Sequence, residues 1–192
     1  MSGITILRAA DRRPQPWKNG GGMTSEVLVH PPGAGSDDFL WRVSIADVEQ
    51  AGDFSSFPGV DRIMAILSGR LALTVAGNST ILECASAPLA YPGDVPTFGR
   101  PLGGMVRDIN LMVRRGGVHA TMRRSPAARF ITTAQTSILI AETGASIAIE
   151  GRNLDLAQFD AVVLAAQQHV TLSGPGLILE IDVASPAPAR LG

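Results

Sequence analysis

The stretch Tyr91-Pro-Gly-Asp-Val-Pro-Thr97 is the short run of this sequence that carries most information about the fold. Its Pro-Gly pair favours a tight turn. On both sides the chain continues as short runs of Val, Ile and Leu, which Gly, Pro, Asn or Asp interrupt. No long segment repeats its apolar residues every 3.6 positions, so we predict an all-β fold, in a sandwich or barrel. The predicted strands cover residues 4–7, 25–30, 39–46, 62–67, 70–75, 80–84, 106–113, 129–133, 137–142, 146–150, 161–165, 169–173 and 177–183.

The charge balance gives no reason to expect nucleic acid or an anionic membrane as a partner. The 192 residues include 16 basic and 17 acidic side chains, for a net charge of −1. No stretch approaches the roughly 20 apolar residues that span a bilayer, and no signal-peptide pattern follows the early arginines. We therefore expect a cytoplasmic protein without a membrane partner. Cys84, the only cysteine, cannot form a disulfide within the chain, and its alternating apolar surroundings predict a buried packing side chain.

Two parts of the sequence are alike. Residues 105–113 and 177–183 both alternate apolar residues with two acidic or amide residues. Asp108 and Asn110 of the first part have counterparts in Glu180 and Asp182, each 72 residues later. We therefore predict two tandem β units with a shared core. The first, residues 1–116, carries the motifs, and the second, residues 117–192, is shorter.

The run at residues 91–97 resembles the second conserved motif of cupin barrels, in which a histidine metal ligand follows the Pro-Gly turn. Thr97 stands at the histidine position here, and His169 stands alone at the matching position of the second unit. The three histidines, His30, His119 and His169, form no H-x-H pair, whereas a transition-metal site needs three or four converging ligands. The prediction is a bicupin, two tandem cupin-like jelly-roll barrels, with no metal and no cofactor.

Three further motifs carry polar and aromatic residues together. The first, Pro16-Trp-Lys-Asn-Gly-Gly-Gly-Met-Thr-Ser-Glu26, places an aromatic ring, a cation and an amide beside glycines that permit close backbone approach. A phosphate-cradling loop would need a helix after these glycines, but residues 24–30 favour a strand. In Phe39-Leu-Trp-Arg-Val-Ser-Ile-Ala46, alternation separates Trp41 from Arg42 and Ser44. The aromatic loop Gly52-Asp-Phe-Ser-Ser-Phe-Pro-Gly-Val-Asp-Arg62 leads into another strand.

These three motifs, together with Arg107-Asp-Ile-Asn-Leu-Met-Val-Arg114, resemble the pattern of the HutD/Ves family. The resemblance lies within residues 16–115 and is looser beyond them. It implies a metal-free bicupin fold that is often dimeric, so a homodimer is expected. It also implies a link to histidine-utilisation genes. The role implied is to bind a pathway intermediate such as N-formylglutamate and so to moderate flux or expression.

The chemistry of the motif residues suits such a ligand, a small dicarboxylate with an amide-like group. Arg42 and Arg62 are predicted to hold carboxylates through paired hydrogen bonds, with Lys18 at the rim. Asn19 and Asn110 would read the formyl or formimino group. Trp17 and Trp41 would wall the site, and Asp108 would orient an arginine. The complete predicted ligand-binding set is Trp17, Lys18, Asn19, Thr24, Glu26, Trp41, Arg42, Ser44, Arg62, Asp108 and Asn110.

Two functions fit this set. The favoured one is a non-catalytic binder of a small anionic metabolite that moderates histidine utilisation, because no catalytic residue set is recognisable. The alternative is a metal-free cupin enzyme, an isomerase, epimerase or hydrolase, with Glu26 or Asp108 as a base. A buried carboxylate with a raised pKa in the pocket would support the enzyme. A carboxylate held against an arginine would support the binder.

Overall fold

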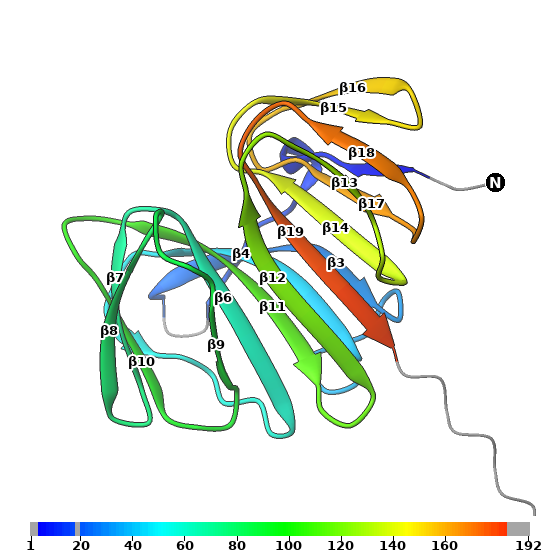
Figure 1. The fold of residues 1–192 in the computed structure, drawn as a ribbon. Helices are drawn as coiled ribbons and strands as arrows, with labels where there is room; N and C mark the ends of the chain where they lie inside the picture. The colour runs from blue at the N-terminus through cyan, green and yellow to red at the C-terminus, as the bar shows by residue number, and fades with distance from the viewer. Residues whose placement is uncertain (1–3, 18–19, 184–192) are drawn as a thin grey trace, which may run out of the picture.

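The computed structural model describes residues 4–17 and 20–183, and it confirms the all-β prediction (Figure 1). Strands form four sheets, two in each half of the molecule. The one helix in the described part of the chain is a single 3-10 turn, η1 (Ala9–Asp11). No helix among these residues is long and apolar enough to cross a membrane.

The first half contains a six-stranded and a four-stranded sheet. In the large sheet the strands lie side by side in the order β2 (Gln15–Pro16), β3 (Gly22–His30), β4 (Trp41–Val48), β11 (Val106–Arg114), β6 (Val60–Ser68) and β9 (Leu89–Pro92). The small sheet has the order β5 (Gly52–Asp53), β10 (Thr97–Pro101), β7 (Arg70–Val75) and β8 (Asn78–Glu83).

The second half has a five-stranded and a four-stranded sheet. The large sheet follows the order β1 (Thr5–Leu7), β17 (Ala161–Leu164), β14 (Thr136–Ala141), β19 (Gly176–Val183) and β12 (Val118–Ser125). The small one follows β13 (Ala128–Ile131), β18 (His169–Leu172), β15 (Ala145–Ile149) and β16 (Arg152–Leu156).

The strand orders of the two halves correspond. The series β4-β11-β6-β9 matches β12-β19-β14-β17, and β10-β7-β8 matches β18-β15-β16. The two segments that are alike in sequence form β11 and β19, which occupy equivalent places in the large sheets. Strand pairing in the described residues gives open sheets and no closed barrel. The bicupin arrangement and the division at residue 116 therefore stay predictions.

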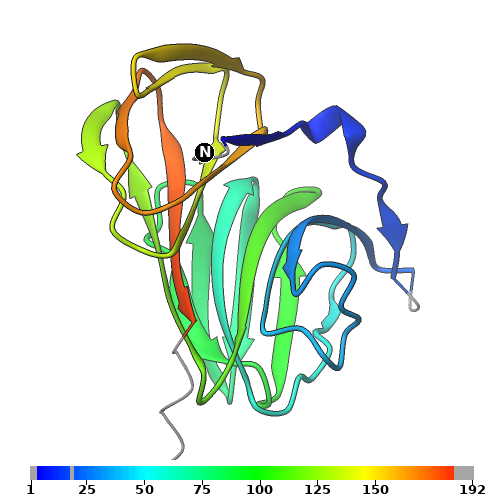
Figure 2. The same ribbon diagram turned by 90° about the vertical axis from the view of Figure 1, so that its right-hand side faces the viewer.

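The two large sheets pack face to face and bury a core between the halves (Figure 2). Alternation on each strand assigns one face to this shared core and the other to the interior of its own half. On β11, for example, Ile109 and Leu111 point to the shared core, whereas Val106 packs inside the first half. The interior of the second half is a separate aliphatic cluster built around β14, β15 and β18.

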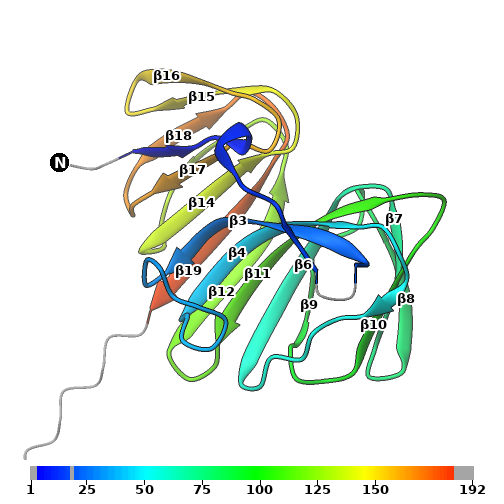
Figure 3. The same ribbon diagram turned by 180° about the vertical axis from the view of Figure 1, so that it is seen from behind.

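Residues 5–17, which we call the N-terminal strap, connect the two halves along the outside (Figure 3). The strap begins as β1, which pairs with β17 of the second half, and ends as β2, which pairs with β3 of the first. Asp160 fixes its start by accepting hydrogen bonds from Arg8 Nη1 and the Ala9 amide, both at 2.7 Å. Arg12 Nη2 donates to the carbonyl oxygen of Phe159 at 2.6 Å. The strap thus belongs to both halves.

Several local expectations differ from the structure, and two of these bear on the site or the cysteine. Cys84 is exposed and not buried, because it lies in the turn after the edge strand β8. The tight turn at Pro92-Gly93 is confirmed, but it joins two strands, β9 and β10, that the sequence pattern did not indicate. These strands are short and their apolar alternation is weak, so they take their conformation from pairing with β6, β5 and β7.

Candidate ligand-binding site

A cavity of about 500 Å³ opens into the interior of the first half. It lies over the inner face of the large sheet and beside the aromatic loop at residues 53–57 and the end of the N-terminal strap. Seven residues of the predicted ligand-binding set line it: Trp17, Thr24, Arg42, Ser44, Arg62, Asp108 and Asn110. Strand alternation explains most of this, because Arg42 and Ser44 on β4 and Asp108 and Asn110 on β11 share the inward face.

A hydrogen-bonded chain of three side chains crosses the inner end of the cavity. Arg62 Nε and Nη2 both donate to Asn110 Oδ1, at 3.2 and 2.8 Å. Asn110 Nδ2 in turn donates to Asp108 Oδ1 at 2.6 Å. The amide of Asn110 therefore has a fixed orientation and separates the cation from the carboxylate. Because Asn110 accepts from Nε and Nη2 of Arg62, the Nη1 side of the guanidinium remains available to donate hydrogen bonds to a ligand.

Arg62 is a buried cation, with 6% of its surface exposed. The rings of Phe54, Phe57 and Tyr91 surround its guanidinium, with centroids 5.3, 5.9 and 5.4 Å from Cζ. Aromatic faces attract a guanidinium, but they do not neutralise its charge. Among the described residues, no carboxylate forms an ion pair with Arg62. An anion entering the cavity would meet an available positive charge.

Asp108 is fully buried, and its Oδ2 has no hydrogen-bond partner. Burial raises the pKa of Asp108 to about 7, an effect that nearby Asp47 adds to and that Arg62 and Asn110 oppose. Tyr91 Oη is also buried without a partner, and burial raises the pKa of Tyr91 to about 12. Asp108 in the cavity lining and Tyr91 beside Arg62 thus both have incomplete hydrogen bonding, a costly condition in a protein interior.

Glu26 and Arg42 form an ion pair at the rim. Arg42 Nε donates to Glu26 Oε2 at 2.9 Å, with side-chain exposures of 26% and 44%. Arg42 lines the cavity, whereas Glu26 is not among the lining residues. Of the two arginines, Arg42 is therefore neutralised by a neighbour and Arg62 is not.

Trp17 lines the cavity, and Gly22 lies next to its ring. Trp17 Nε1 donates to Thr24 Oγ1 at 2.6 Å, and its ring meets Phe54 edge-on at 6.1 Å. Gly22 is needed at this wall because a Cβ there would lie 2.2 Å from the carbonyl oxygen of Asp47. The expected close approach of the glycine-rich segment is confirmed at this position.

The turn after β9 supports Arg62 from behind. The Gly93 amide donates to the Val60 carbonyl oxygen at 2.7 Å, and the Phe57 amide donates to the Gly93 carbonyl oxygen at 2.8 Å. A Cβ on Gly93 would lie 2.9 Å from that Val60 oxygen, so glycine permits the contact. Arg115 then holds Asp94 of the same turn, with Nη1 to Oδ2 at 2.7 Å. The motif that indicated a cupin fold therefore positions the cation and its aromatic neighbours.

Besides Glu26 at the rim, one described member of the predicted set does not line the cavity. Trp41 is buried in the shared core and stacks on His30 at 5.5 Å, so the prediction that it walls the pocket is wrong. It shares a strand with Arg42 but points to the opposite face, as alternation requires. Lys18 and Asn19 lie outside the described residues.

Several lining residues were missed by the sequence reasoning. Asp53, Phe54, Ser55 and Phe57 come from the aromatic loop, which the motif pattern singled out without assigning it to the site. Gln15, Pro16, Ala46 and Met112 complete the lining. Alternation alone would have added Ala46 and Met112, because they continue the inward faces of β4 and β11.

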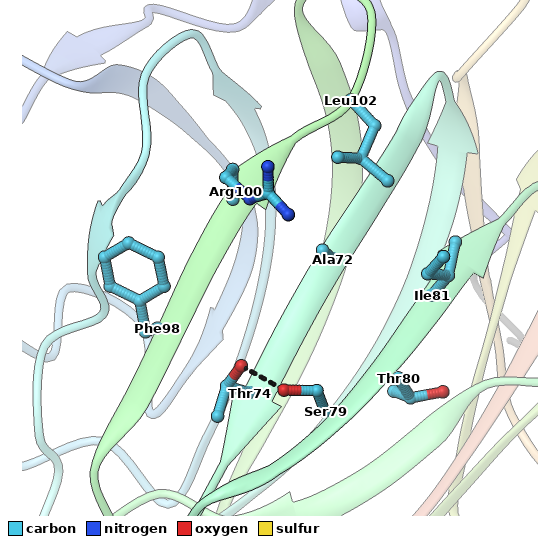
Figure 4. Close-up of a pocket in the computed structure, with 8 residues that line it drawn as sticks. All are labelled: Ala72, Thr74, Ser79, Thr80, Ile81, Phe98, Arg100 and Leu102. Carbon is cyan, nitrogen blue, oxygen red and sulfur yellow. Dashed lines mark hydrogen bonds between the residues drawn. The ribbon is translucent and has the colours of Figure 1, made fainter.

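A second hollow lies on the outer face of the small sheet and differs in character (Figure 4). It measures about 410 Å³ and includes two exposed apolar side chains, Phe98 and Ile81. Thr74 and Ser79 hydrogen-bond to each other across it at 2.7 Å. Arg100 is the charged residue of its lining, and no buried polar group faces it. The inner cavity, with its buried cation, is therefore the candidate site.

Metal-binding side chains do not gather within the described residues. No group of three or more His, Cys, Asp or Glu is placed there to hold an ion. The chemistry that the cavity offers comes from a guanidinium, an amide, a buried carboxyl group and aromatic rings.

The comparison with protein families agrees with these residues. The family model described as HutD matches residues 9–179. This chain belongs to the HutD family. An uncharacterised 21.2 kDa protein in the hutC 3′ region of Pseudomonas putida is 34% identical to this HutD-family chain over 174 residues, covering 88% of this chain and 91% of the relative. Protein Ves of Citrobacter koseri is 37% identical over 109 residues, which are 56% of each chain.

Solved structures agree with the HutD assignment. The structure of HutD from Pseudomonas fluorescens SBW25 has a TM-score of 0.85 and 31% identity, covering 95% of this chain and all of the other. A cupin 2 conserved barrel domain protein from Leptotrichia buccalis has a TM-score of 0.57 at 9% identity, covering 92% and 99% of the chains. The second likeness concerns the fold alone and shows that the architecture is cupin-like.

Proposed function

We propose that this HutD-family protein is a metal-independent bicupin that binds a small anionic metabolite, of the N-formylglutamate or formiminoglutamate type, and thereby moderates histidine utilisation. The observation that carries the proposal is Arg62, a buried cation that faces a cavity of about 500 Å³ and has no carboxylate partner among the described residues. A buried charge normally has a counter-charge. A ligand carboxylate would supply it.

The geometry supports a carboxylate as the bound group. A planar guanidinium can give a carboxylate two parallel hydrogen bonds, and the Nη1 side of Arg62 is turned away from Asn110. Each charge-assisted hydrogen bond contributes about 1.5–3 kcal/mol. Phe54, Phe57 and Trp17 limit the water around these bonds. After the entropic cost of association, the expected Kd lies between about a micromolar and a millimolar, which suits a metabolite sensor.

The histidine-utilisation context comes from the relatives. The P. putida protein is named for its place in the hutC 3′ region, and this chain is 34% identical to it over 174 residues. The matching strand orders of the two halves support the bicupin interpretation, in which each half descends from one cupin unit.

The enzyme alternative is favoured by one observation, the buried Asp108 with a pKa near 7. A carboxyl group of this kind suits a general base. Two facts support the binder instead. Asp108 is fully buried, and its Oδ1 is already held by Asn110. Glu26, the other candidate base, is held by Arg42.

The test is calorimetric titration of the metal-stripped protein with N-formylglutamate, formiminoglutamate, urocanate, histidine and glutamate, followed by NMR of each compound. Saturable binding with the compound recovered unchanged supports the sensor. Conversion of a compound supports the enzyme. Absence of binding to all five contradicts the small-anion proposal.

A further inference from the structure

We infer that the inner end of the cavity takes up a carboxylate together with one proton, and that Asp108 is the residue that holds this proton. The inference rests on the proposed function, because it concerns a ligand at Arg62. Beyond that function, it specifies the group that the ligand places at Arg62. This group is a carboxylate with one negative charge, and not a phosphate or sulfate group with two.

The first step is the incomplete bonding of Asp108. Its Oδ1 accepts a hydrogen bond from Asn110, whereas its Oδ2 is buried without a partner. A buried carboxylate is stable only if hydrogen bonds and a nearby cation compensate for lost hydration. Here one oxygen is compensated and the other is not. A proton on Oδ2 would remove the charge that needs compensation.

The second step is the set of charges around Asp108. Arg62 on β6 is the cation that favours the carboxylate, acting across Asn110. Asp47 on β4 disfavours it, and Tyr91 on β9 is a neutral neighbour that interacts with it electrostatically. Arg42 on β4 and Asp53 on β5 line the same cavity, but Arg42 is paired with Glu26. The ionised form of Asp108 is thus stabilised mainly by the positive charge of Arg62.

The third step is the arrival of a ligand. A carboxylate on the Nη1 side of Arg62 would place two anions on one guanidinium, with Asn110 between Asp108 and the cation. Two carboxylates that share a buried site do not both remain ionised. Asp108 then takes a proton from the solvent, an O–H bond forms at its carboxyl group, and the ligand anion keeps the cation. A phosphate or sulfate group, which carries two negative charges on one group at Arg62, would leave one of them uncompensated even after this proton is taken up.

The experiment is titration calorimetry of the full chain with N-formylglutamate at pH 8, in Tris and in HEPES, whose enthalpies of ionisation differ. The expected difference in heat corresponds to an uptake of about one proton per ligand, and the affinity falls about tenfold per pH unit above pH 7. Asp108→Asn should abolish the proton uptake and flatten the pH dependence. Glu180→Gln, at the counterpart position of the second half, should keep both. Wild-type binding without proton uptake, or uptake that survives in Asp108→Asn, overturns the inference.

Two further measurements separate this inference from the proposed function. Inorganic phosphate should bind at least about tenfold more weakly than the carboxylate, and equal binding contradicts the ligand class. In the ligand-free protein, carbon NMR of the aspartate carboxyl groups should show the Asp108 titration midpoint about one pH unit or more higher in Arg62→Gln, and little changed in Arg62→Lys. An unmoved midpoint overturns the inference whether or not a ligand is found. A moved midpoint without binding of any compound supports the Arg62–Asp108 coupling and contradicts the proposed function.

Discussion

The two halves of the molecule share a strand order and differ in what fills them. In the second half, ten buried aliphatic side chains pack together between the sheets. In the first half, the corresponding space holds a cavity, and β11 turns Asp108 and Asn110 into it. Their counterparts on β19 lie near the surface: the Glu180 side chain is 24% exposed and Asp182 is exposed. The same strand order therefore encloses a packed aliphatic core in one half and a cavity in the other. The residue types at a few inward-facing positions make the difference.

The largest expected effect comes from opening a cavity in the solid half. Leu139 is 1% exposed in the aliphatic cluster, and Leu139→Ala should lower the free energy of unfolding by about 2–5 kcal/mol in urea denaturation. Met112→Ala is the matched change in the first half, where the side chain already borders the cavity. Water can occupy the added space there, so the loss should fall at or below the low end of that range. Equal losses would contradict the contrast between the halves.

Arg62→Ala is expected to weaken binding of N-formylglutamate by about 100-fold or more in calorimetric titration, because about 3 kcal/mol of charge-assisted bonding is lost. Arg123→Ala in the second half, which removes an exposed arginine 4.0 Å from Glu180, should leave the affinity unchanged. Circular dichroism of both variants checks that they fold. Normal binding by folded Arg62→Ala would mean that the pocket is wrongly placed.

Asp108→Asn should stabilise the ligand-free protein at alkaline pH. Unfolded Asp108 loses its proton near pH 3.8 and folded Asp108 near pH 7, so between these values the folded state holds more protons. The contribution of Asp108 to the wild-type free energy of unfolding therefore falls as the pH rises from about 4 to 7. Above about pH 7 this contribution is constant. The advantage of the variant should grow by about 2–3 kcal/mol between pH 5 and pH 8. A difference that is independent of pH in urea denaturation would refute the raised pKa.

The smallest effect is expected at the rim. Arg42 is partly exposed and already paired with Glu26, so Arg42→Ala should weaken binding about tenfold or less. Glu26→Gln would free Arg42 and should strengthen binding slightly at low salt. The decisive result is a larger loss of affinity in Arg62→Ala than in Arg42→Ala. The reverse order would place the anion at the rim.

Strand alternation accounts for much of what the sequence predicted. It placed Arg42 and Ser44 together on one face of their strand, opposite Trp41, and both line the cavity with Asp108 and Asn110. Alternation also places Trp41 and Arg42 on opposite faces of β4. It therefore predicts that Trp41 does not share the pocket with Arg42, and Trp41 lies in the shared core.

The rest depends on contacts between distant segments, which no local pattern encodes. The bonds between Arg62 and Asn110 arise from the pairing of β6 with β11, and their register follows from the whole sheet. Phe54 and Phe57 reach Arg62 because the loop before β6 folds back over the strand that follows it. Cys84 escaped burial because β8 is an edge strand, a property of sheet order and not of sequence.

The N-terminal strap has a consequence for biosynthesis. β1 leaves the ribosome long before β17, the strand with which it pairs, and Asp160, which fixes the start of the strap, is also made late. The strap carries Gln15, Pro16 and Trp17 to the cavity wall. The nascent chain can therefore assemble the sheets of the first half and the β2–β3 pairing early, but the start of the strap is fixed only after most of the second half has been translated. A chain halted between the halves would hold this cavity wall through β2 and Trp17 alone, with the other end of the strap unpaired.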